Sequence, residues 1–172
     1  LNVTIPYKQD IMRYLDEIDQ KAIEIGAVNT ITLKENKAIG TNTDYDGFKS
    51  CLDKAGIAIS KNGFTLLGAG GAAKAVIKVL QDEKASKITL ISRNPDKTKL
   101  EYPNFEILAY EEIHEIKDKY CLINCTPVGT YPNIEECPIK KEAIKKYSNV
   151  VDLIYNPQKT KLLKLADEYG IN

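Results

Sequence analysis

An apolar run at residues 64–67 is followed directly by the glycine-rich segment GAGGAA at residues 68–73, and a helical pattern then runs from Lys74 to Leu80. The first glycine permits a tight turn, the second lets the backbone approach a bound group, and the alanines let the helix pack close to the strand. Free N–H groups at the helix start can donate to phosphate oxygens. A purely structural glycine turn is the alternative. The segment favours a nucleotide-phosphate loop made by Gly68, Ala69, Gly70, Gly71 and Ala72.

From residue 63 onward, short apolar runs alternate with amphipathic stretches. The apolar runs predict strands at residues 64–67, 88–91, 105–109, 122–124 and 150–154. Between them, helices are expected to begin at Gly71, Pro95, Glu111, Lys140 and Lys159. Strands that alternate with helices are typical of a parallel sheet covered on both faces. We therefore predict an α/β fold with a Rossmann-type doubly wound parallel sheet, in a domain over residues 44–172.

The preceding segment, residues 1–43, has a different pattern and is predicted to be part of another α/β domain. A strand at residues 1–5 is expected to end at Pro6, followed by a helical pattern whose apolar residues are Ile11, Tyr14, Leu15, Ile18, Ala22, Ile23 and Ile25. Strands at residues 28–33 and 38–41 are separated by a hairpin turn at residues 35–37. Asp44 or a neighbour should cap the next helix, which ends near Gly56.

Composition excludes several classes of function. The 172 residues carry 24 basic and 24 acidic side chains, and no basic stripe predicts nucleic-acid binding. The apolar stretches are strand-sized and no leader is visible, so neither a membrane span nor secretion is expected. Cys51, Cys121, Cys125 and Cys137 form no C-x-x-C pair and are interpreted as reduced thiols of a cytoplasmic protein. A lone histidine, His114, argues against a zinc site or a serine–histidine triad, so no metal is expected.

The tip of the second predicted strand bears on the choice of dinucleotide. In NAD-binding folds an acidic residue about 20 residues past the glycines binds the ribose hydroxyls. This strand instead ends in Ser92, Arg93 and Asn94, and Lys97 adds a second positive charge. A guanidinium can bind a 2′-phosphate and stack on adenine, so NADP is favoured. The alternatives are that Arg93 is a plain loop residue and that Asp96 contacts a ribose or caps the next helix.

Several further motifs occur in a fixed order along the whole chain. They are NVTIPYK at residues 2–8, GAVNT at 26–30, NTDYDG at 42–47, GAGGAA at 68–73, NCTPVG at 124–129 and DLIYNP at 152–157. In these motifs the chain closely resembles the shikimate dehydrogenase family. The resemblance implies NADPH-dependent, reversible reduction of 3-dehydroshikimate to shikimate in aromatic amino-acid biosynthesis. It also implies a partial substrate-binding domain over residues 1–43 and an NADP-binding domain over residues 44–172.

The resemblance also implies roles for single residues. Lys8 and Asp44 match the catalytic pair, and Thr4, Asn29 and Tyr155, with that pair, match positions that bind the substrate. Thr126, with the glycine loop and the strand tip, matches the cofactor site. A lysine ammonium can give a proton to a ketone oxygen and take it back, while a carboxylate orients it. Taken alone, Lys8 could be a surface charge, Asp44 a helix cap and Asn29 a turn residue.

Two alternatives stay open at this point. One is a quinate/shikimate dehydrogenase that uses NAD, and the other is a non-catalytic nucleotide-sensing module. The family's carboxylate-binding serines and its glutamine-bearing C-terminal helix do not occur in residues 1–172, so the chain is expected to be a fragment lacking both ends. We expect a monomer or homodimer that binds a small-molecule substrate, with no nucleic acid or membrane as partner.

Overall fold

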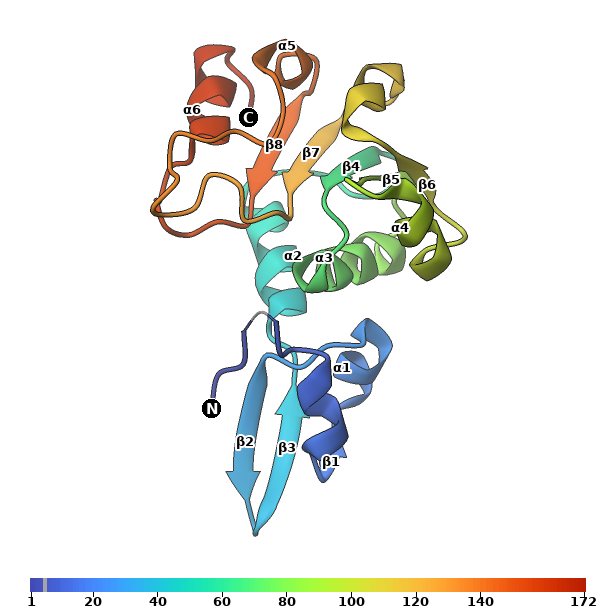
Figure 1. Cartoon of the computed structure of the whole chain (residues 1–172), viewed down its shortest axis with the longest axis vertical. Coiled ribbons are helices and arrows are strands. Elements are labelled where there is room, and N and C mark those ends of the chain that lie inside the picture. The colour runs from blue at the N-terminus through green and yellow to red at the C-terminus, as the bar shows by residue number, and fades with distance from the viewer. Residues whose placement is uncertain (5) are drawn as a thin grey trace. The chain divides into compact units, whose positions relative to one another are not determined.

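A computed structural model describes residues 1–4 and 6–172. The chain divides into two compact units, each made of two segments. The first unit holds Leu1–Gly56 and Gly71–Asp82, and the second holds Ile57–Gly70 and Glu83–Asn172. Figure 1 shows the helices and strands of both units, coloured along the chain. The division of the chain into domains at residues 43 and 44 stays a prediction.

The first unit begins with a small sheet whose strand order is β1-β3-β2. Its elements are η1 (Asp10–Tyr14), β1 (Glu17–Ile18), α1 (Gln20–Ile25), β2 (Thr30–Lys34) and β3 (Lys37–Thr41). β2 and β3 are antiparallel and form the expected hairpin. Glu35 and Asn36 both have positive φ, of 51° and 60°, which is the backbone conformation that a two-residue hairpin turn requires. The buried core beside this small sheet consists of Ala22, Val28 and Ile31.

The expected helical pattern that included Ile18 is wrong in its middle part. The 3-10 helix η1 ends at Tyr14, and residues 17–18 form a strand parallel to β3. The edge of β3 explains the difference, because its backbone carbonyls accept hydrogen bonds from this segment. Asp16 N–H donates to the Ala38 carbonyl at 3.0 Å, and Asp19 N–H donates to the Gly40 carbonyl at 3.0 Å. The Asp19 carboxylate then caps α1 by accepting from Ala22 N–H at 2.8 Å.

The expected strand at residues 1–5 forms only a single antiparallel bridge, between Asn2 and Thr30. Ile5 lies outside the described residues, so the end of that strand is not tested. The N-terminal amine donates to the Ile31 carbonyl at 2.7 Å, which fixes the first residue beside β2.

The first unit also contains α2 (Asp44–Lys54) and α3 (Gly71–Asp82). The Tyr45 hydroxyl on α2 donates to the Asp82 carboxylate on α3 at 2.9 Å. Lys78 on α3 lies between two carboxylates, 2.7 Å from Asp82 and 3.0 Å from Glu24 on α1. These contacts connect the three helices through their polar side chains.

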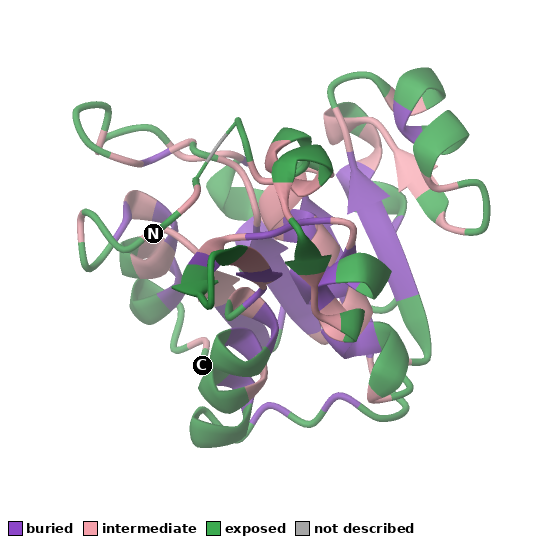
Figure 2. Ribbon diagram, turned by 90° about the horizontal axis from the view of Figure 1, so that it is seen from below, coloured by how far each residue is buried: buried purple, intermediate pink, exposed green. Residues whose placement is uncertain are grey.

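The second unit is built on a five-stranded parallel sheet with the order β6-β5-β4-β7-β8. Its strands are β4 (Gly63–Leu67), β5 (Lys87–Ile91), β6 (Glu106–Leu108), β7 (Cys121–Asn124) and β8 (Asn149–Asp152). All five expected strands are confirmed, although β8 stops two residues early. β4 and β7 are buried along their whole length, as the purple strands in Figure 2 show. The chain adds strands on one side of β4 and then switches to the other, which is the Rossmann-type arrangement predicted.

The remaining helices of this unit start within two residues of their expected positions. They are α4 (Pro95–Glu101), η2 (Tyr110–Glu115), α5 (Lys141–Ile144) and α6 (Lys161–Glu168). η2 is a 3-10 helix and α5 is a single turn. Leu67, Leu122, Ile144 and Leu162 belong to the apolar core of this unit.

Over the described residues, none of the helices has the length and apolar character needed to cross a membrane. In the same part of the chain, no group of histidine, cysteine and acidic side chains is placed to hold a metal ion.

Candidate functional site

Lys8 and Asp44, which lie far apart in sequence, form an ion pair in the first unit. The distance from Lys8 Nζ to Asp44 Oδ2 is 2.6 Å, and the two side chains are 15% and 37% exposed. The Lys8 backbone carbonyl accepts from Val28 N–H at 2.8 Å, which anchors the lysine beside the chain that enters β2. The pair is therefore partly shielded from water while it stays accessible to a ligand.

Asn29 holds the Asp44 carboxylate in place. Asn29 Nδ2 donates to Asp44 Oδ1 at 2.8 Å, so Lys8 and Asn29 occupy different oxygens of the same carboxylate. Asn29 Oδ1 accepts from the Thr43 backbone N–H at 3.0 Å. Asp44 is the first residue of α2 rather than its cap, and its side chain is used by these partners instead. The N-cap is the neighbouring Thr43, as the sequence prediction allowed, although its side chain makes no capping hydrogen bond.

Sequence reasoning missed Asn42, whose side chain is buried. Its Nδ2 donates to the Ala27 carbonyl at 2.8 Å, and its Oδ1 accepts from Asp44 N–H at 2.9 Å. The residue lies in the NTDYDG motif, and a polar side chain between the buried end of a strand and a helix start was the signal that could have identified it.

The other two predicted substrate residues are exposed. Thr4 follows Val3, whose N–H donates to the Asn29 carbonyl at 2.8 Å, so the segment of Thr4 lies beside Asn29. Tyr155, in the second unit, is 90% exposed. Its phenol is thus available to solvent just after the end of β8.

The glycine loop connects the end of β4 to the start of α3, as expected. Gly68 has a φ of +89°, and an added Cβ there would lie 2.8 Å from Thr126 Cγ2. Gly68 N–H donates to the Ile91 carbonyl at 2.8 Å, which ties the loop to the end of β5. In contrast, nothing lies within 4 Å of a Cβ added at Gly70 or Gly71. Among Gly68, Gly70 and Gly71, only Gly68 is required by its backbone conformation and its neighbours, and the loop leaves open space at Gly70.

At the tip of β5 the predicted cofactor residues divide into two kinds. Ser92 and Asn94 organise the backbone: Asn94 Oδ1 accepts from Lys97 N–H at 3.1 Å and caps α4, and Ser92 Oγ accepts from Asn94 N–H at 3.1 Å. The helix cap is therefore Asn94 and not Asp96. Arg93 and Lys97 are exposed. Burial raises the pKa of Tyr110, and the positive charge of Arg93 opposes that rise.

Thr126 follows β7 and is held by Asn124, which is fully buried. Asn124 Oδ1 accepts from both the backbone N–H and the hydroxyl of Thr126, at 3.0 and 2.7 Å. The Thr126 hydroxyl accepts from Val128 N–H at 3.2 Å. Asn124 belongs to the NCTPVG motif, but no sequence pattern predicts that its side chain organises the loop.

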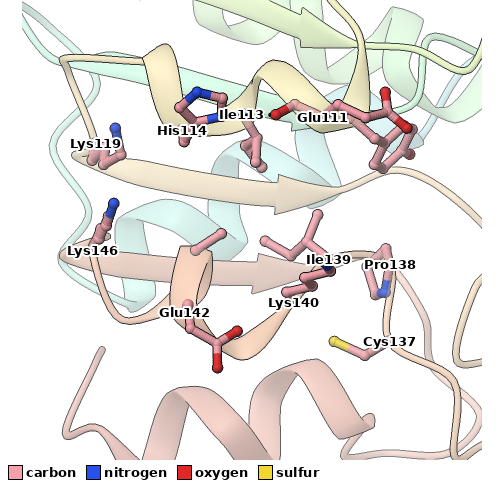
Figure 3. Close-up of a pocket in the computed structure, with 12 residues that line it drawn as sticks. Glu111, Ile113, His114, Lys119, Cys137, Pro138, Ile139, Lys140, Glu142 and Lys146 are labelled. Carbon is pink, nitrogen blue, oxygen red and sulfur yellow. Dashed lines mark hydrogen bonds between the residues drawn. The ribbon is translucent and has the colours of Figure 1, made fainter.

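A cavity of about 590 Å³ lies elsewhere in the second unit, between η2 and the segment of residues 137–146 (Figure 3). It is lined by apolar side chains such as Ile113 and Ile139 and by charged ones such as Lys119 and Lys146. None of the predicted site residues lines it.

The chain is similar in sequence and fold to known shikimate dehydrogenases. The family model for the shikimate dehydrogenase substrate-binding domain matches residues 1–31. A shikimate dehydrogenase (NADP(+)) from Clostridium perfringens is 47% identical over 172 residues, which is 99% of this chain and 64% of the relative. The chain thus spans less than two thirds of that protein's length.

Two solved structures have the same fold. A chorismate mutase/shikimate 5-dehydrogenase fusion protein from Clostridium acetobutylicum matches with a TM-score of 0.95 and 46% identity, over 100% of this chain and 63% of the other. A shikimate 5-dehydrogenase from Thermus thermophilus in complex with NADP(H) and shikimate matches with a TM-score of 0.84 and 31% identity, over 99% of this chain and 64% of the other.

Proposed function

We propose that this chain belongs to the shikimate dehydrogenase family and is part of an enzyme that reversibly reduces 3-dehydroshikimate to shikimate with NADPH. The observation that carries the proposal is the 2.6 Å contact between Lys8 and Asp44, two residues that the sequence pairs only through the family's motifs. A relative named shikimate dehydrogenase (NADP(+)) is 47% identical to this chain.

The residues present fit NADP. The open space at Gly70 leaves room for the pyrophosphate at the start of α3, and a helix of this length offers free N–H groups there. Arg93 and Lys97 are exposed and would hold the 2′-phosphate. When bound, the nicotinamide supplies the hydride that the ketone carbon of the substrate accepts.

The chain's own residues handle the proton. Lys8, as an ammonium, donates a proton from Nζ to the ketone oxygen, which becomes the new hydroxyl. In the reverse direction the neutral amine takes that proton back. Asp44 accepts a hydrogen bond from Nζ, orients it and stabilises its positive charge. Thr4, Asn29 and Tyr155 would bind the hydroxyl and carboxylate groups of the substrate.

The relatives do not favour the two alternatives, an NAD-dependent quinate/shikimate dehydrogenase and a non-catalytic sensor. An assay of the protein at its natural length separates the three functions. We expect kcat/KM for shikimate with NADP⁺ to exceed that for quinate with NAD⁺ by about tenfold or more, a difference of about 1.4 kcal/mol. Equal or faster turnover of quinate with NAD⁺ would support the first alternative. NADPH binding without turnover of either acid would support the second.

The proposal includes a cytoplasmic location, since both reactants are small polar metabolites. It also includes a monomer or homodimer as the oligomeric state. Sedimentation of the purified protein measures the oligomeric state.

A further inference from the structure

Two polar side chains stand next to each other where β7 and β8 end. Asn124 and Asp152 are the last residues of these parallel strands and are register partners. Asn124 Nδ2 donates to Asp152 Oδ1 at 3.1 Å. Asn124 is completely buried, and Asp152 is partly buried. A carboxylate in such a place needs hydrogen-bond donors around it, because burial of an unpaired charge is costly.

On one side, this pair reaches the proposed cofactor loop. Asn124 Oδ1 holds Thr126 by two hydrogen bonds, of 3.0 and 2.7 Å. Thr126 Cγ2 in turn occupies the place that a Cβ on Gly68 would need. The position of Thr126 beside the glycine turn therefore depends on the orientation of the Asn124 amide. The shorter contact of Nδ2 with Asp152, at 3.1 Å, and a longer one with the Val128 carbonyl, at 3.4 Å, set which way that amide points.

On the other side, the pair reaches the segment that carries Tyr155. Asp152 Oδ1 also accepts from Ile154 N–H at 3.0 Å, and Oδ2 accepts from the Thr160 hydroxyl at 2.7 Å. Thr160 is itself buried and caps α6 by accepting from Leu163 N–H at 3.4 Å. The carboxylate thus ends β8, sets the backbone just before Tyr155 and anchors the return of the chain into α6.

The two segments also contact each other directly. The Thr130 hydroxyl and the Tyr131 N–H both donate to the Asn156 carbonyl, at 3.0 and 3.1 Å. The segment after β7 and the segment after β8 are therefore hydrogen-bonded to each other and, through Asn124 and Ile154, to Asp152.

We propose that Asp152 is a positioning residue, which holds the cofactor-side segment at residues 125–129 and the substrate-side segment at residues 153–157 in one arrangement. It contacts neither ligand and acts through Asn124, Thr126 and the backbone of Ile154. This inference rests on the proposed function and adds to it a residue to which neither the motifs nor the relatives' names give a role.

The test is a set of variants in the protein at its natural length. Asp152→Ala removes every acceptor, whereas Asp152→Asn keeps Oδ1 for Asn124 and Ile154. Asp167→Ala, which removes an exposed carboxylate on α6, is the matched control. The NADPH dissociation constant is measured by nicotinamide fluorescence and KM for shikimate by steady-state rates, well below each variant's melting temperature.

We expect Asp152→Ala to weaken NADPH binding and to raise KM for shikimate by about fivefold or more each, since each lost buried hydrogen bond is worth about 1 kcal/mol. Asp152→Asn should recover both values to within about twofold, and Asp167→Ala should change neither. If Asp152→Ala does not fold, Asp152→Ser, which keeps one oxygen, should give the same pattern with a smaller effect.

Unchanged ligand affinities with only a lower melting temperature would show that Asp152 is merely structural, and would overturn the inference. A failure of the proposed function looks different, because the unmutated protein would then either not bind NADPH or bind it without turning over shikimate.

Discussion

Gly68 is constrained in two independent ways, by its positive φ of +89° and by Thr126 Cγ2 at 2.8 Å from an added Cβ. Gly70 has neither constraint. We expect Gly68→Ala to lower the free energy of unfolding by about 1–3 kcal/mol through backbone strain and overpacking. Gly70→Ala should keep the stability and instead weaken NADPH binding, because its methyl group would occupy the space proposed for the pyrophosphate.

Urea unfolding and NADPH titration of the two variants measure these effects side by side. Equal loss of stability in both variants would contradict the division of the loop into a structural and a ligand-binding glycine.

Lys8 is expected to supply the proton in the reaction. Lys8→Ala should lower kcat by roughly 100-fold or more, the usual scale of general acid–base catalysis, while NADPH affinity changes by less than about twofold. The control is Lys37→Ala on the exposed hairpin. This change removes an ion pair with Glu17 whose 2.5 Å distance is similar to that of the Lys8–Asp44 pair. Steady-state rates of both variants decide the matter, and near-normal turnover in Lys8→Ala would show that the proton comes from another group.

Single residues also show where sequence reasoning stopped. The pairing of Lys8 with Asp44 followed from the motifs because chemistry needs both residue types. The roles of Asn42 and Asn124 did not, because a buried amide that orients another side chain has no sequence pattern of its own. Its partners are set by the fold, through strand ends that lie far apart along the chain.

At the scale of elements, the polar cluster of Glu24, Tyr45, Lys78 and Asp82 connects α1, α2 and α3. Hydrogen bonds to Asp82 and Glu24 raise the pKa of Lys78 to about 12. Its ammonium in turn lowers the pKa of Glu24 and of Asp82 below their ordinary values of 4.5 and 3.8.

We expect Lys78→Met to lower the free energy of unfolding by about 0.5–1 kcal/mol at neutral pH, as for ion pairs near the surface. Carboxyl groups with lowered pKa values stabilise the fold above their unfolded pKa, and that stabilisation is lost as pH falls through the folded pKa. The difference between the variant and the unmutated protein should therefore shrink below about pH 4. Urea titrations across the acid range measure it, and a difference that does not vary with pH would mean that packing of the lysine stem is responsible.

The elements of the parallel sheet were predictable and those near β1 were not. Short apolar runs with helices between them have few other solutions, so all five strands agree with the sequence pattern to within a few residues. Ile18 fits a helical period equally well, but the open edge of β3 offers backbone partners that no local pattern reveals. β8 stops at Asp152 because the aspartate turns the chain by accepting from Ile154 N–H.

At the scale of the whole molecule, the chain has a proposed proton-transfer pair in one compact unit and a dinucleotide-type sheet in the other. The central claim is that the chain binds NADP in preference to NAD. It depends on Arg93, an exposed guanidinium at the tip of β5, where NAD-binding folds have an acid. Asp96 is nearby, but an exposed carboxylate is screened by water and should oppose the 2′-phosphate only weakly.

The most direct test is a fluorescence titration of this chain with NADPH and with NADH, repeated on Arg93→Ala. Charge-assisted hydrogen bonds to the 2′-phosphate should make NADPH bind at least about tenfold more tightly, a difference of about 1.4 kcal/mol. Arg93→Ala should remove most of that preference and leave the affinity for NADH nearly unchanged. Equal affinities for the two dinucleotides in the unmutated chain would contradict the account and favour an NAD-dependent enzyme.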